Sequence, residues 1–166
     1  MPHNFKLTGD YYVSKAGNDS WDGLTPNTPK RTVQAALNLA TSGTKYIVIG
    51  AGVYYETISK ATSTNTIYVT GDGTVVMQGN GSNQFFLNPN SGVRNGGIYF
   101  SNIIFTNYQS ILLGFNDQTY YFTNCKILCE IQVYYGGGSA FSNMNFVNCT
   151  LLNSNFSVGS GPATTT

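Results

Sequence analysis

The carboxylates of this 166-residue chain are few. Hydrolysis of a polysaccharide needs acids in pairs, because one protonates the leaving group while another activates water or the sugar. The seven acids are Asp10, Asp19, Asp22, Glu56, Asp72, Asp117 and Glu130, and none recurs at a fixed offset along the chain. His3 is the single histidine. We therefore expect a protein without catalytic residues and without a cofactor.

Two of the acids lie close together in the segment Gly17–Gly23, which reads GNDSWDG. Asp19 and Asp22 could ligate Ca²⁺ through their carboxylate oxygens. Alternatively, they accept hydrogen bonds from backbone amides of a tight loop, as Asp and Asn commonly do. We favour the second interpretation, because a calcium loop needs more acids at alternating positions.

Adjacent tyrosines occur four times, at positions 11–12, 54–55, 120–121 and 134–135. On an alternating strand one member of each pair must face outward. Such a side chain could be buried in a protein interface, could stack on a sugar, or could simply reflect the strand propensity of tyrosine. The binding or interface candidates are Tyr11, Tyr54, Tyr120, Tyr134 and Tyr135, together with Phe156.

A Phe-x-Asn motif recurs in the later part of the chain. Asn102, Asn124 and Asn148 follow one another at intervals of 22 and 24 residues, and two looser repeats cover residues 47–54 and 68–76. A period of this length built from strands alone predicts a β-solenoid, here with roughly five coils. Asn suits the bend between strands because it tolerates left-handed backbone angles, and the three Asn side chains could bond to one another as a ladder.

The alternation after each Asn predicts which side chains form the core. Cys125 and Cys149 fall at equivalent inward positions of adjacent coils, where they are either small core residues, which we favour, or a disulfide. The expected inward residues are Phe100, Phe122, Phe146, Ile103, Cys125, Cys149, Phe105, Ile127 and Leu151, and the expected outward ones are Ile104, Lys126 and Thr150.

One helix is predicted, over residues 29–41. Thr28 suits the N-cap, Pro29 the first turn and Gly43 the position just past the end. Its apolar stripe of Val33, Ala36, Leu37 and Ala40 would cover the N-terminal end of the solenoid. We expect residues 1–10 to form an arm, 11–156 the β-helix domain and 157–166 a flexible tail. The tail offers no cap, so another chain should cover the C-terminal end.

Charge and hydropathy exclude several classes of partner. Charged residues make up 9% of the chain, the net charge is +1, and the basic residues do not cluster. We therefore expect no nucleic-acid binding. Residues 1–10 have no apolar core of a signal peptide, and no stretch approaches about 18 consecutive apolar residues, so we expect synthesis in a cytoplasm and no membrane association.

The opening of the chain resembles that of pectin-lyase-like parallel β-helix proteins. The residues that carry the resemblance are Tyr12-Val13-Ser14, Gly17-Asn18-Asp19, Asp22-Gly23, Thr25-Pro26, Pro29, Thr32–Leu37, Ile47–Ile49, Gly52–Glu56 and Gly79–Gly81. Lys30 stands where an aromatic residue often follows the proline, and Ala51 where proline often precedes Gly-x-Tyr. The resemblance implies an all-β fold, a short single-stranded right-handed parallel β-helix with one N-terminal capping α-helix.

The resemblance also implies a class of function, because this architecture recurs in bacteriophage structural and tailspike proteins. We expect a non-enzymatic component of a phage virion: a capsid decoration, a spike or a tail-associated protein. Its partners would be other virion proteins and further copies of itself, with a trimer favoured by analogy with spikes. The alternative is a receptor-binding protein that binds or depolymerises a host surface polysaccharide, as a lyase or glycoside hydrolase would.

Overall fold

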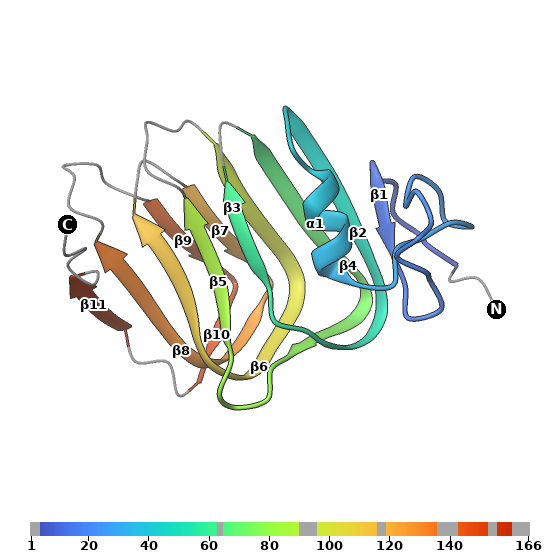
Figure 1. The fold of residues 1–166 in the computed structure, drawn as a ribbon. Coiled ribbons are helices and arrows are strands. Elements are labelled where there is room, and N and C mark those ends of the chain that lie inside the picture. The colour runs from blue at the N-terminus through green and yellow to red at the C-terminus, as the bar shows by residue number, and fades with distance from the viewer. Residues whose placement is uncertain are drawn as a thin grey trace.

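Parallel strands wind into a β-solenoid (Figure 1). The computed structural model describes residues 4–62, 65–89, 96–115, 119–135, 143–152 and 156–160. The elements are β1 (Tyr11–Val13), α1 (Val33–Leu39), β2 (Thr44–Tyr55), β3 (Ser59–Thr62), β4 (Thr66–Gln78), β5 (Gln84–Pro89), β6 (Gly97–Phe115), β7 (Thr119–Thr123), β8 (Lys126–Tyr135), β9 (Asn143–Val147), β10 (Thr150–Leu151) and β11 (Phe156–Ser160).

The strands form three faces, and within the described ranges the strands pair in parallel. The first face contains β1, β7, β9 and the opening parts of β2, β4 and β6. The second contains the later parts of β2 and β4, the middle of β6, the start of β8, and β10. The third contains β3, β5, the ends of β6 and β8, and β11. The chain makes about four turns, consistent with the right-handed parallel β-helix expected from the sequence.

Left-handed asparagines turn the chain between the first two faces. Asn102, Asn124 and Asn148 have φ angles of 56°, 53° and 52°. The predicted bends are therefore confirmed. The predicted ladder of side-chain hydrogen bonds is not: within the described ranges no hydrogen bond joins the three side chains, which are exposed to solvent. The conformation of the backbone, and not a side-chain ladder, accounts for Asn here.

Stacked columns of apolar side chains fill the interior. Phe100, Phe122 and Phe146 stack with ring centroids 5.4 and 5.2 Å apart. Ile103, Phe105, Cys125 and Ile127 are buried, whereas Lys126 and Thr150 are exposed, as the alternation predicts. The cysteines are free, and the thiol of Cys125 donates to the carbonyl of Phe100. Both observations agree with a core role.

The helix is shorter than the sequence suggests. It begins at Val33, and the N-cap is Thr32 rather than Thr28. Pro29 and Lys30 lie outside it because Lys30 forms a bridge with β1, donating its amide to Tyr12 and accepting from the amide of Ser14. Backbone pairing with a strand thus outcompetes the first helical turn. The residues of the predicted stripe are fully buried: Val33, Ala36, Leu37 and Ala40.

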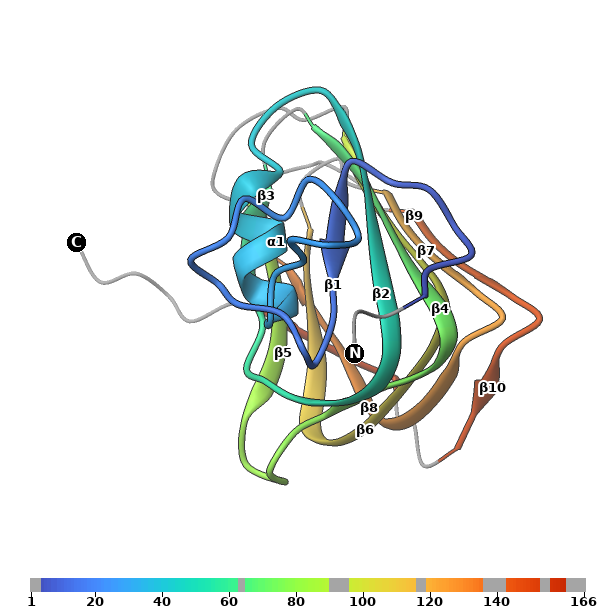
Figure 2. The same ribbon diagram turned by 90° about the vertical axis from the view of Figure 1, so that its right-hand side faces the viewer.

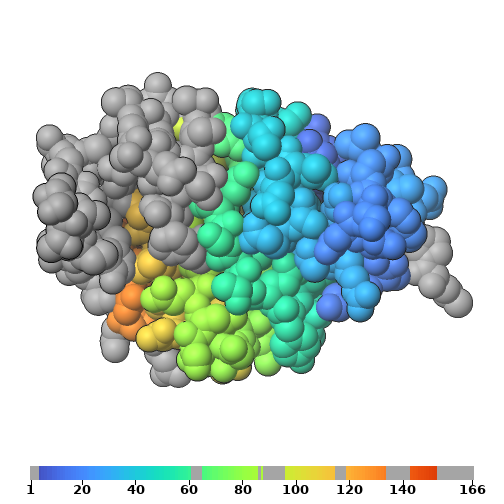
Figure 3. Space-filling model, viewed as in Figure 1, coloured from blue at the N-terminus to red at the C-terminus, as the bar shows by residue number. Residues whose placement is uncertain are grey.

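The helix and the segment before it lie over the N-terminal end of the solenoid (Figure 2). The ammonium group of Lys60, in β3, donates to the carbonyls of Leu37 and Ala40 at the end of the helix, and burial lowers the pKa of Lys60. From this end, successive segments form adjacent bands on the surface (Figure 3).

The two terminal segments depart in part from the sequence-based division. The amides of Lys6 and Leu7 in the N-terminal arm both donate to Asp72, which fixes the arm against the solenoid. At the other end, β11 extends the solenoid to Ser160 and so enters the segment expected to be a tail. Residues 161–166 of that tail lie outside the described residues.

Substitution of Asn124 tests whether the left-handed backbone conformation or hydrogen bonding by the amide side chain explains the use of Asn at the bends. Asn124→Ala should lower the free energy of unfolding by about 1 kcal/mol, because alanine lacks the short polar side chain that lets Asn tolerate the left-handed region. Asn124→Gly should be nearly neutral, because glycine adopts positive φ without steric cost. Urea unfolding of both variants provides the measurement. An equal loss for Gly and Ala would instead indicate that the amide side chain carries the stability.

Candidate functional site

Two of the predicted interface tyrosines belong to the core. Tyr54 is 0% and Tyr120 1% exposed, and the outward members of those pairs are Tyr55 and Tyr121. Tyr54 is the register partner of the buried Met77, and Tyr120 is that of the buried Ile98. These inward columns determine which tyrosine of each pair faces the core. Their hydroxyls are satisfied inside, donating to the carbonyls of Gly50 and Gly114 at 2.7 and 3.0 Å. The prediction of Tyr54 and Tyr120 as surface residues is therefore wrong.

The remaining predicted aromatic residues do not form one surface. Tyr11 is half-buried against the core and its hydroxyl donates to the carbonyl of Leu39 at the end of α1. Its neighbour Tyr12 is buried and packs edge-on against Phe5. The side chains of Tyr134, Tyr135 and Phe156 lie outside what the structure describes.

Asp19 and Asp22 serve as hydrogen-bond acceptors within the N-terminal loop. Asp19 accepts from the amides of Arg31 and Thr32 at 2.8 and 2.9 Å, and Asp22 accepts from the hydroxyl of Thr28 and the amide of Leu24. Partial burial tends to raise the pKa of Asp19, but the bonds from Thr32 and Arg31 outweigh it and lower that pKa. In the described ranges no cluster of three His, Cys, Asp or Glu could hold a metal ion.

Other acids also bind backbone amides. Both carboxylate oxygens of Glu56 accept from the first amides of α1, those of Val33 and Gln34, at 2.9 Å each. Burial raises the pKa of Glu56 even though these two amides favour its ionised form. Asp10 accepts from the amide of Tyr46, and Asp72 holds the N-terminal arm. These carboxylates thus connect segments of the backbone to one another.

Four outward tyrosines form a continuous stack across the first face. The ring centroids of Tyr46, Tyr68, Tyr99 and Tyr121 are separated by 4.8, 4.5 and 4.8 Å, with interplanar angles of 9°, 23° and 8°. We call these residues the tyrosine ladder. The outward positions beside the ladder on β4, β6 and β7 are uncharged: Thr66, Thr70, Gly97, Ser101, Thr119 and Thr123.

Gly97 accommodates the ladder. A Cβ atom at this position would lie 2.8 Å from Cε2 of Tyr99 and 2.9 Å from the carbonyl oxygen of Thr119. The ring of Tyr99 therefore occupies the space beside Gly97. Burial raises the pKa of Tyr99, and its neighbours Tyr68 and Tyr121 raise it further.

The sequence contains a pattern that predicts the tyrosine ladder, but grouping the tyrosines into adjacent pairs hides it. Tyr99 and Tyr121 each precede a bend asparagine by three residues, and Tyr46 and Tyr68 each precede an inward aliphatic residue, Ile47 or Val69. Aligning the repeats by strand register, and not by Tyr-Tyr pairs, brings the four tyrosines into one column.

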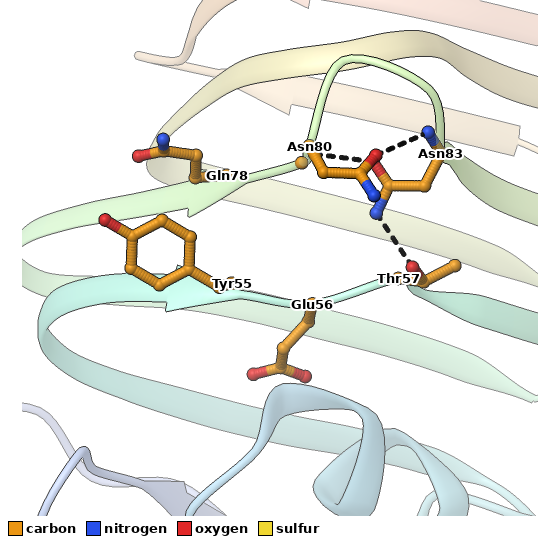
Figure 4. Close-up of a pocket in the computed structure, with 7 residues that line it drawn as sticks. Tyr55, Glu56, Thr57, Gln78, Asn80 and Asn83 are labelled. Atoms are coloured by element: carbon orange, nitrogen blue, oxygen red, sulfur yellow. Dashed lines mark hydrogen bonds between the residues drawn. The ribbon is translucent and has the colours of Figure 1, made fainter.

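A polar pocket lies where β2 and β4 end (Figure 4). Its volume is about 220 Å³, and Tyr55, 69% exposed, lies at its edge. The amide group of Asn83 donates to the hydroxyl of Thr57 at 2.8 Å, while the side-chain oxygen of Asn80 accepts from the amides of Ser82 and Asn83. The side chain of Glu56 turns toward α1. The other lining residues are Gln78 and Gly79.

Comparison with known proteins finds no relative from which a function could be transferred to this chain. No protein-family model, no curated protein and no solved structure matches the chain. Among the described residues, no helix has the length and apolar character needed to cross a membrane.

Stability should fall as the pH rises above about 10, the ordinary pKa of tyrosine. Burial raises the pKa of Tyr54, Tyr108 and Tyr120 in the folded protein, so the unfolded chain loses these protons first. Since the unfolded state then binds fewer protons than the folded state, a rising pH favours unfolding.

Tyr120→Phe tests this pH dependence. The variant should cost about 1 kcal/mol at neutral pH, because the carbonyl of Gly114 loses its donor. Above pH 10 its decline should be shallower by up to about 1.4 kcal/mol per pH unit. Denaturant unfolding at several pH values provides the measurement, with Tyr55→Phe as the exposed control. A decline of unchanged slope in Tyr120→Phe would contradict the assignment.

Proposed function

We propose that the protein is a non-enzymatic structural component of a bacteriophage virion, of the pectin-lyase-like kind, that works through protein–protein interfaces. The parallel β-solenoid supports the resemblance at the level of fold. The acids support a structural role, because Asp10, Asp19, Glu56 and Asp72 accept hydrogen bonds from backbone amides. The phage assignment itself comes from the resemblance in the opening segment of the chain.

The observation that carries this proposal is the opening of the core at the C-terminal coil. Phe122, Cys125 and Ile127 are buried, whereas their counterparts one coil later are partly exposed. Those counterparts are Phe146, Cys149 and Leu151. Leu152 follows them and is 50% exposed. The inward columns thus reach solvent at this end.

Strand pairing is also incomplete at this coil. In the described part of the chain, β9 pairs with β7 alone, while β10 and β11 pair with β8 alone. An open strand edge beside apolar side chains suits the addition of a further layer of strand. We therefore place the contact with neighbouring chains at this coil. The neighbours would be other virion proteins or further copies, with a trimer favoured by analogy with phage spikes.

Leu152→Glu tests the assembly surface. A buried carboxylate disfavours contact, so the variant should weaken self-association or binding to the neighbouring virion protein at least about tenfold. Leu24→Glu is the matched control, because Leu24 is 56% exposed and belongs to the loop at the N-terminal end. Light scattering coupled to size-exclusion chromatography measures the assembly. A protein that stays monomeric at high concentration and binds no particle component would exclude this role, as would equal effects of the two variants.

Virion membership requires a separate measurement. The chain should migrate with intact particles through a density gradient and should appear at a constant copy number relative to the capsid protein. Quantitative mass spectrometry of the gradient fractions decides the matter. Recovery only in the soluble fraction of the infected cytoplasm would remove the virion assignment while leaving the assembly surface intact.

A second candidate function is binding of a host surface glycan, and the pocket at Tyr55 favours it. An exposed aromatic ring beside amide side chains can stack on a sugar ring and donate hydrogen bonds to its hydroxyls. The carboxylate of Glu56 is engaged by α1, so the groups left to face a ligand are neutral. The pocket therefore suits one uncharged sugar residue of a longer chain.

Tyr55→Ala should weaken such glycan binding at least about tenfold, the equivalent of losing one stacking contact with its buried area. Tyr46→Ala is the control, since Tyr46 is an exposed tyrosine on a different face. A glycan array followed by titration calorimetry of the best ligand provides the measurement. Equal losses in both variants, or an array without bound glycan, would reject this candidate.

A further inference from the structure

The tyrosine ladder presents ring edges rather than ring faces. Its centroids lie 4.5 to 4.8 Å apart, close to the roughly 4.8 Å between neighbouring strands. Each inner ring is therefore covered on both faces by another tyrosine. A sugar needs a free ring face for stacking, so the two inner rings are poor glycan platforms, unlike Tyr55. Their chemistry must come from the phenol groups and the ring edges.

The register fixes the rings against one another. Tyr68 is the direct partner of Tyr99 in the pairing of β4 with β6, and Tyr99 is that of Tyr121 in the pairing of β6 with β7. Inward neighbours on the same strands, such as Val69 and Phe100, are buried and hold this register. None of the four hydroxyls donates to another described residue, and Tyr46 is 49% exposed. Water is therefore available to take a phenolic proton.

We propose that the tyrosine ladder is an oxidative crosslinking site, at which a one-electron oxidant joins tyrosines of consecutive coils. The oxidant takes one electron from each of two neighbouring phenols, and their hydroxyl protons pass to water. The two phenoxyl radicals then form a carbon–carbon bond between the ring carbons next to the hydroxyls. The two ring hydrogens move to the oxygens and restore the phenols. The product has lost two electrons and two protons overall.

The geometry favours Tyr68 and Tyr99, which have the shortest centroid separation in the ladder, 4.5 Å. Coupling requires two radicals side by side, and the stack holds the rings in place before oxidation. The resulting bond would join β4 to β6 and link two coils covalently. It would stabilise the fold mainly by restricting the unfolded chain, as a disulfide of similar span does. This inference does not depend on the proposed virion role.

The experiment uses the full chain at low concentration, oxidised by photogenerated tris-bipyridyl ruthenium(III) with persulfate as electron acceptor. Trypsin then separates the partners, because residues 61–94 contain Tyr68 as their one tyrosine and residues 95–126 contain Tyr99 together with Tyr108, Tyr120 and Tyr121. Fragmentation of the linked pair in the mass spectrometer identifies which of these four is coupled to Tyr68. We expect dityrosine fluorescence and a linked pair of these peptides, two hydrogens lighter than their sum. We also expect a melting temperature higher by on the order of 10 °C.

Two variants distinguish the ladder from general exposure. Tyr68→Phe retains the stacked ring but removes the phenol, so the linked peptide pair should fall at least tenfold, with an unchanged circular dichroism spectrum. Tyr55→Phe removes the more exposed tyrosine and should leave the yield unchanged. The proposal is overturned if the 61–94 to 95–126 link is absent, if it persists in Tyr68→Phe, or if the products are mainly dimers between chains.

Discussion

In-register parallel stacking is the constraint from which the remaining structure follows. Each coil places its side chains directly over those of the coil before, so one residue type repeated at one offset becomes a column. Inside, this gives the phenylalanine stack of Phe100, Phe122 and Phe146. Outside, the same geometry gives the tyrosine ladder. The core and the outer surface therefore share one register.

Strand stacking leaves backbone amides and carbonyls at the corners and at the N-terminal end without a neighbouring strand to bond to. The few charged side chains form hydrogen bonds with these groups. Glu56 accepts from the first amides of α1, and Lys60 donates to carbonyls at its end. Asp72 holds the N-terminal arm. Because buried polar groups are costly unless bonded, these side chains are best understood as parts of the scaffold.

The surfaces left for recognition differ in chemistry and in place. The C-terminal coil offers apolar columns and open strand edges, the pocket at Tyr55 offers an aromatic ring with amides, and the tyrosine ladder offers stacked phenols. An assembly contact at the C-terminal coil would leave the pocket and the ladder exposed, because the pocket lies where β2 and β4 end and the ladder lies on the first face. A solenoid with accessible sides is consistent with the proposed structural role.

The sequence alone determined the solenoid, because the Phe-x-Asn period and the alternation after each Asn are local properties of the chain. It therefore identified the bends at Asn102, Asn124 and Asn148 and the inward columns, including Cys125. Only the tertiary structure decided where α1 starts and which tyrosine of each pair faces the core. Lys30 leaves the helix because β1 lies beside it. Tyr54 faces the core because its register partner Met77 lies in an inward column, and the carbonyl of Gly50 accepts its hydroxyl there. The ladder exists only when coils stack, since its members are distant in sequence and meet through register alone.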